Sequence, residues 1–131
     1  MADILFVEKR RSLAKPVSRL LKTAGHAVVA SGYGRALQEL TRGGFAAVAL
    51  DWPAQEPRAR KLARTASDAG VPVLAITNRL VKCVHSGRHL VRVFLEKPAT
   101  PQEIAEVMCE MVAAARLPGG KEASAATAGE K

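Results

Sequence analysis

The chain has 131 residues, of which 48% are hydrophobic, and carries a net charge of +8. This length allows one domain with a hydrophobic core, and it is too short for two. No apolar run approaches the roughly 20 residues of a membrane span, and the first residues lack the features of a signal peptide. The two cysteines are not spaced for a zinc site. We therefore expect a soluble, cytoplasmic domain with no membrane partner.

Strand-like and helix-like segments alternate along the chain. Short apolar runs predict parallel strands that are covered on both faces, and apolar residues at helical spacing predict the connecting helices. In chain order we expect a strand at 4–7, a helix at 13–24, a strand at 27–30, a short helix at 36–40, a strand at 46–50, a helix at 58–69, a strand at 73–76, a basic helix at 80–86, a strand at 93–95 and a final helix from 101. Such a series predicts an α/β fold with a doubly wound, five-stranded parallel sheet in the flavodoxin-like order 2-1-3-4-5.

The alternating pattern stops near residue 116. Pro118-Gly-Gly interrupts it, and residues 121–131 are rich in Ala, Ser, Thr, Gly and charge, with no large apolar residue. A segment of this composition cannot bury enough apolar surface to offset the loss of chain entropy. We expect one domain at residues 1–116 and a disordered tail at 117–131.

Three polar residues lie at the carboxyl ends of successive predicted strands: Asp51, Thr77 and Lys97. In an open parallel sheet these ends meet in one crevice. A carboxylate can accept a phosphoryl group, an ammonium can neutralise its oxygens, and a hydroxyl can donate a hydrogen bond to them. Each residue alone has a structural explanation, as a helix cap, a β-branched strand residue or a turn. Together they favour a shared phosphoryl-accepting site.

The ordered set of segments resembles response-regulator receiver domains, the CheY-like modules of two-component (phosphorelay) signal transduction. The resemblance covers about residues 3–115 and rests on Ile4–Glu8, Gly43–Asp51, Val71–Thr77 and Val93–Pro98. It implies that Asp51 is the phosphoacceptor, Thr77 the switch hydroxyl, Lys97 the lysine that contacts the phosphate, and Phe94 the aromatic switch position.

The chain departs from this family in its acidic pocket. Receiver domains normally carry two adjacent acidic residues after the first strand, which bind a divalent cation together with the phosphoacceptor, whereas this chain has Glu8 and Lys9. An ammonium in place of a carboxylate removes a magnesium ligand and adds repulsion. Trp52 follows Asp51 directly, and the Asp-Gly usual in the following loop is missing. We expect Mg²⁺ binding by Glu8 and Asp51 to be weak or absent, with Lys9 paired to Asp51.

An alternative stays open, in which Lys9 points to solvent and Glu8 still binds Mg²⁺ with Asp51. The protein would then be a conventional phosphoacceptor receiver. In the main interpretation it is a stand-alone receiver-like protein, a pseudo-receiver and not an enzyme, which signals through a protein-binding surface at about residues 80–112. Its expected partners are a histidine kinase and/or a downstream target.

Basic residues mark the expected partner surface: Arg79, Lys82, Arg88 and Arg92. They would attract an acidic protein. In a further alternative, Arg79, Arg88 and Arg92 clamp a guanine dinucleotide such as cyclic di-GMP. Nucleic acid is disfavoured because the basic residues are spread over several helical segments and aromatic residues are scarce.

Overall fold

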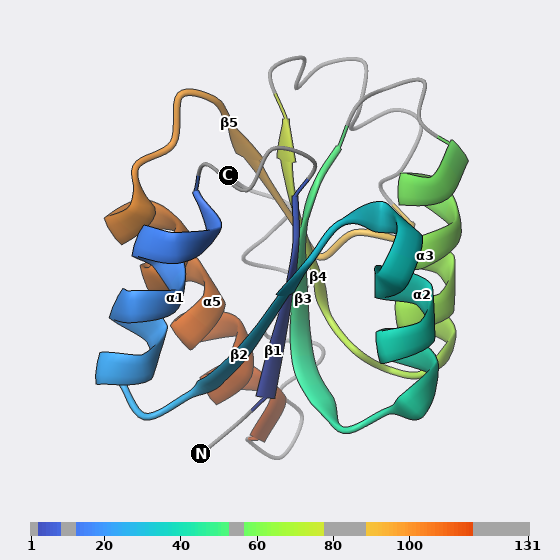
Figure 1. The fold of residues 1–131 in the computed structure, drawn as a ribbon, viewed down its shortest axis with the longest axis horizontal. Helices are drawn as coiled ribbons and strands as arrows, with labels where there is room; N and C mark the ends of the chain where they lie inside the picture. Colours follow the sequence, from blue (N-terminus) through green and yellow to red (C-terminus); the bar gives the residue numbers. More distant parts are fainter. Residues whose placement is uncertain (1–2, 9–12, 53–56, 78–88, 117–131) are drawn as a thin grey trace.

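The central element is a parallel five-stranded sheet with helices on both faces (Figure 1). The computed structural model describes residues 3–8, 13–52, 57–77 and 89–116. The strands are β1 (Asp3–Val7), β2 (Ala27–Ser31), β3 (Phe45–Asp51), β4 (Val73–Thr77) and β5 (Val93–Glu96). Their order is β2-β1-β3-β4-β5, which confirms the predicted doubly wound topology.

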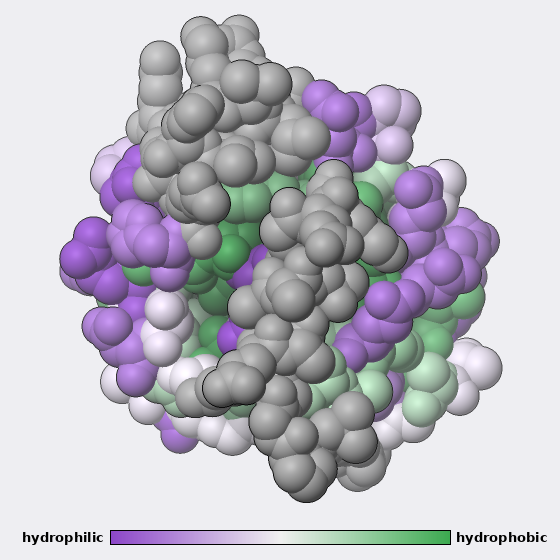
Figure 2. All heavy atoms as spheres, turned by 180° about the vertical axis from the view of Figure 1, so that it is seen from behind, coloured by the Kyte–Doolittle hydropathy of each residue, from purple (hydrophilic) through white to green (hydrophobic). Residues whose placement is uncertain are grey.

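Two pairs of helices cover the sheet. On one face lie α1 (Ala14–Thr23) and α5 (Pro101–Arg116), and on the other lie α2 (Tyr33–Arg42) and α3 (Pro57–Asp68) (Figure 1). From behind, hydrophilic side chains are seen on both flanks and apolar surface toward the middle (Figure 2). The helix predicted at 80–86 and the tail predicted at 117–131 lie outside the described residues. In the described part, no helix is long and apolar enough to cross a bilayer.

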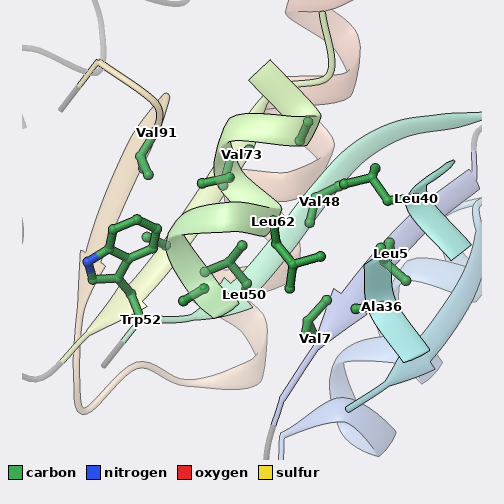
Figure 3. Packing of buried hydrophobic residues seen from close by; sticks show 14 of the residues in the cluster. Leu5, Val7, Ala36, Leu40, Val48, Leu50, Trp52, Leu62, Val73 and Val91 are labelled. Carbon is green, nitrogen blue, oxygen red and sulfur yellow. The ribbon is translucent and has the colours of Figure 1, made fainter. Parts of the chain in front are cut away.

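The strands are apolar on both faces, and this creates two separate cores. In β3, Val48 and Leu50 pack toward α2 and α3, in the cluster that Figure 3 shows. Ala47 and Ala49 pack toward α1 and α5. Side chains alternate along a strand, so a register shift of one residue would exchange the two sets. Burial on both faces therefore holds the strand ends at one edge of the sheet.

The end of α2 and the beginning of α5 depend on local capping. Helix α2 begins at Tyr33, three residues before the predicted start, and Tyr33 is buried in the core facing α3. Gly43 ends this helix at φ 82°, a left-handed conformation that favours glycine. Helix α5 begins with a capping box, in which the Glu103 N–H donates to Oγ1 of Thr100 and the Thr100 N–H donates to Oε1 of Glu103.

Cys109 of α5 is partly buried and packs against the core between the sheet and α1 and α5. Burial, followed by the charge of the neighbouring Glu110, raises the pKa of its thiol. The thiolate is the reactive form of cysteine, so this environment favours a packing role.

Candidate functional site

Asp51, Thr77 and Lys97 lie at the carboxyl edge of three adjacent strands. Asp51 is the last residue of β3, Thr77 is the last residue of β4, and Lys97 directly follows β5. The backbone N–H of Lys97 donates to the carbonyl oxygen of Thr77 at 2.7 Å. In the pairing of β3 with β4, Asp51 lies opposite Ile76. The sheet thus brings the ends of β3, β4 and β5 to one place.

The side chains of Asp51 and Lys97 are in direct contact. Nζ of Lys97 donates to Oδ1 of Asp51 at 2.7 Å, and the two side chains are 24% and 37% exposed for Asp51 and Lys97, respectively. A solvent-accessible pair of this kind contributes only about 0–1 kcal/mol to stability. The contact matters more for electrostatics, because a positive charge lies beside the carboxylate that would carry a phosphoryl group.

Thr77 is buried, with 1% of its surface exposed. Its strand lies between β3 and β5, so its position in the sheet is between those of Asp51 and Lys97. The sequence-based expectation that these three strand ends adjoin one another agrees with this geometry. Their individual roles stay predictions.

Phe94 and Trp52 form an aromatic pair near the carboxyl ends of β3 and β5. Phe94 lies on β5 and Trp52 directly follows β3, and their rings meet edge-on with centroids 6.3 Å apart and planes at 88°. Trp52 is 2% exposed and belongs to the core that faces α2 and α3 (Figure 3). This contact was not predicted from the sequence. The sequence does indicate the side on which Trp52 lies, because Val48, Leu50 and Trp52 are every second residue and such residues share one face of a strand.

Glu8, the expected acidic-pocket residue, caps α1. Its Oε1 accepts the backbone N–H groups of Leu13 at 2.9 Å and Ala14 at 3.1 Å, and its Oε2 lies 3.2 Å from the Leu13 nitrogen. The N-cap residue Leu13 forms no side-chain cap, and the first turn of α1 contains no acidic residue. Glu8 therefore satisfies free N–H groups and places a negative charge at the positive end of the helix.

The two carboxylates expected to bind Mg²⁺ have protein partners in this structure. Mg²⁺ requires near-octahedral oxygen ligands, commonly one or two carboxylates with waters. Here Glu8 accepts the α1 cap bonds, and Asp51 accepts the Lys97 ammonium. Among the described residues, no three His, Cys, Asp or Glu side chains gather in a way that could hold a metal ion. Lys9 and residues 53–56 lie outside the described residues, so the expected pairing of Lys9 with Asp51 stays a prediction.

The expected partner surface is only partly within the described structure. Arg79, Lys82 and Arg88 lie outside the described residues. Arg92 precedes β5, and its backbone N–H donates to the carbonyl oxygen of Val73 at 2.9 Å. The acidic-partner surface and the cyclic di-GMP clamp both stay predictions.

Solved structures of receiver domains share this fold. A CheY-like response regulator receiver domain protein from Methanospirillum hungatei JF-1 has a TM-score of 0.74 and 20% identity, with 88% of this chain and 96% of that chain covered. A response regulator receiver protein from Sinorhizobium medicae WSM419 has a TM-score of 0.74 and 23% identity, with coverage of 88% and 97%. The chemotaxis response regulator CheY4 of Vibrio cholerae has a TM-score of 0.71 and 20% identity, with coverage of 85% and 98%.

No protein-family model matches the sequence, and no curated protein matches it. The structural likeness nevertheless spans almost the whole of each receiver domain. The chain therefore has the fold of CheY-like response-regulator receiver domains.

Proposed function

We propose that this chain is a receiver-like module of two-component signal transduction in which metal-dependent phosphorylation at Asp51 is weakened or lost. It acts by binding a protein partner and not by turnover. The observation that carries the receiver-like assignment is the 2.7 Å contact between Lys97 and Asp51 at the carboxyl edge of the sheet. This pairing fits a site that receives or mimics a phosphoryl group.

The loss of metal-dependent chemistry is supported by the surroundings of the carboxylates. The Glu8 carboxylate accepts hydrogen bonds from two backbone N–H groups at the beginning of α1, those of Leu13 and Ala14, and a metal ion bound to the same oxygens would compete with them. Lys9 follows in the sequence where the family has an acidic residue. Asp51 remains 24% exposed, so its carboxylate is open to reagents that do not need the usual metal site.

The Trp52–Phe94 contact supports a route from this site to a binding surface. Trp52 follows Asp51 in the chain, and Phe94 lies on the edge strand β5. A change at the end of β3 would alter the packing of Phe94, because close-packed rings transmit small displacements. The partner of this surface would be a histidine kinase, a downstream target or both.

The first prediction is that Mg²⁺ causes no saturable change in Trp52 fluorescence at submillimolar concentration. Trp52 is the only tryptophan and adjoins Asp51. Titration of the wild-type protein with magnesium chloride, with and without the phosphoryl analogue beryllofluoride, measures the response. Lys9→Asp should produce a saturable response, because it restores a carboxylate ligand and removes the repulsion of an ammonium.

Two matched variants separate the causes of this effect. Lys9→Gln removes the positive charge without adding a carboxylate and should recover less of the response than Lys9→Asp. Asp51→Asn in the Lys9→Asp background should abolish the recovered response. A tight magnesium response in the wild type, followed by beryllofluoride binding, would instead establish the conventional phosphoacceptor alternative.

A further inference from the structure

Tertiary packing gathers much of the positive charge of the chain on the α2–α3 side of the sheet. Helices α2 and α3 pack against each other on this side (Figure 1). Together they carry six cationic and two acidic residues. The cations are Arg35, Arg42, Arg58, Arg60, Lys61 and Arg64, and the acids are Glu39 and Asp68. We call the six cations the α2–α3 basic face.

The opposite helical layer is nearly balanced. Helices α1 and α5 carry four cationic and three acidic residues. The cations are Lys15, Arg19, Lys22 and Arg116, and the acids are Glu103, Glu106 and Glu110. The positive excess of these four helices is therefore concentrated on one side of the molecule. Basic residues that are spread out in the sequence lie on neighbouring helices in the fold.

Most of this face is open to solvent. Five of its six residues are exposed, and Arg60 is partly buried. Lys61 and Arg64 form no ion pair with another described residue, and Arg42 is bound at 3.3 Å to Glu39. The Arg58 guanidinium lies 5.8 Å from the centre of the Tyr33 ring, so the cations of α3 reach the beginning of α2.

The stability of α3 does not explain its charge pattern. Its first turn carries Arg58 and Arg60 and no acidic residue, and Lys61 follows directly. The amino end of a helix is positive and favours carboxylates, so cations at this end raise the electrostatic energy of the isolated protein. A bound polyanion would reverse the sign of that contribution.

The side chains of the α2–α3 basic face suit a phosphate polymer better than a protein as the binding partner. Protein interfaces rely on apolar and aromatic anchors in a desolvated centre, whereas nucleic-acid interfaces are more polar and more positive. Among the described residues, the one exposed large hydrophobic side chain is Val29, which lies on β2 and not on either of these helices. Five of the six cations are arginines, whose planar guanidinium binds phosphate through two hydrogen bonds.

We propose that the α2–α3 basic face binds the phosphate backbone of duplex nucleic acid without reading its sequence. This interaction is separate from the Asp51 site and does not depend on phosphorylation. Each cation that neutralises a phosphate releases a condensed counterion, so binding must weaken as salt concentration rises.

Fluorescence anisotropy with a labelled 24-base-pair DNA duplex of arbitrary sequence tests the proposal. Lys61→Glu/Arg64→Glu should weaken binding by at least about tenfold at low salt, and should reduce the slope of log affinity against log salt by about 2. Lys15→Glu/Arg19→Glu on α1 is the matched control, because it reverses the same number of exposed charges. It should change the affinity by less than about threefold. Circular dichroism and thermal unfolding would establish that both variants are folded.

Three results would overturn the proposal. The first is no salt-dependent binding of the duplex by the wild-type protein. The second is an equal loss of affinity in both variants, which would assign the binding to net charge and not to this face. The third is binding of polyglutamate that is tighter than binding of the duplex and is abolished by Lys61→Glu/Arg64→Glu. That result would assign the face to an acidic protein.

Discussion

Replacing Trp52 with alanine should lower the free energy of unfolding by about 3–5 kcal/mol. The side chain is 2% exposed and lies in the core between the sheet and α2 and α3. Its removal would leave a cavity beside Phe94 and end the edge-on ring contact. Domains of this size are commonly stable by about 5–15 kcal/mol, so the variant would be close to unfolding at moderate temperature.

Urea denaturation followed by circular dichroism measures this effect, because the variant has no tryptophan fluorescence. Trp52→Phe is the control, since it keeps an aromatic ring against Phe94 and should cost less than half as much as the alanine variant. A loss below about 1 kcal/mol for Trp52→Ala would contradict the buried position, because buried tryptophans rarely tolerate truncation.

Glu8→Ala should destabilise the protein by about 2 kcal/mol in the absence of any metal. The variant removes the carboxylate that accepts the N–H groups of Leu13 and Ala14 at the beginning of α1. Glu8 is 7% exposed, so water would replace these bonds poorly. The charge that complements the amino end of the helix would also be lost.

Thermal and urea unfolding in EDTA, and again with added magnesium chloride, test this role. Glu8→Gln keeps an oxygen that can accept a hydrogen bond and should lose less stability than Glu8→Ala. A helix-capping role predicts the same difference between the variants with and without magnesium. If Glu8→Ala were as stable as the wild type in EDTA and less stable only with magnesium, Glu8 would be a metal ligand and not a cap.

The topology of the sheet was predictable because its cause is local and repeated. Short apolar runs with helical segments between them favour parallel strands, and right-handed crossovers leave few ways to arrange such strands. The proximity of Asp51 and Lys97 followed from the same argument, because parallel strands end at a common edge. Their 2.7 Å contact agrees with that expectation. The beginning of helix α2 at Tyr33 was not predicted, because the apolar spacing marked only the middle of the helix.

The partners of Glu8 and Trp52 became clear only from the tertiary structure. The position of Glu8 in the sequence suggested a metal ligand, but its carboxylate accepts N–H groups at the beginning of α1. The Trp52 ring meets Phe94 on the same face of the sheet, although the two residues are far apart in the chain and β4 separates their strands. Both contacts depend on the orientation of a side chain relative to another element, which hydrophobic periodicity does not specify.

The total charge of the protein can be read from the sequence, but the location of the charge on its surface depends on the tertiary structure. The amino-acid sequence alone determines the net charge of +8, and along the chain the cations are scattered. The doubly wound connections send α2 and α3 to one face of the sheet and α1 and α5 to the other, which collects cations on the first side and mixes the charges on the second. Composition sets the total charge. The connection between successive strands decides where the charge lies, because the direction of each crossover selects the face of the sheet that its helix covers.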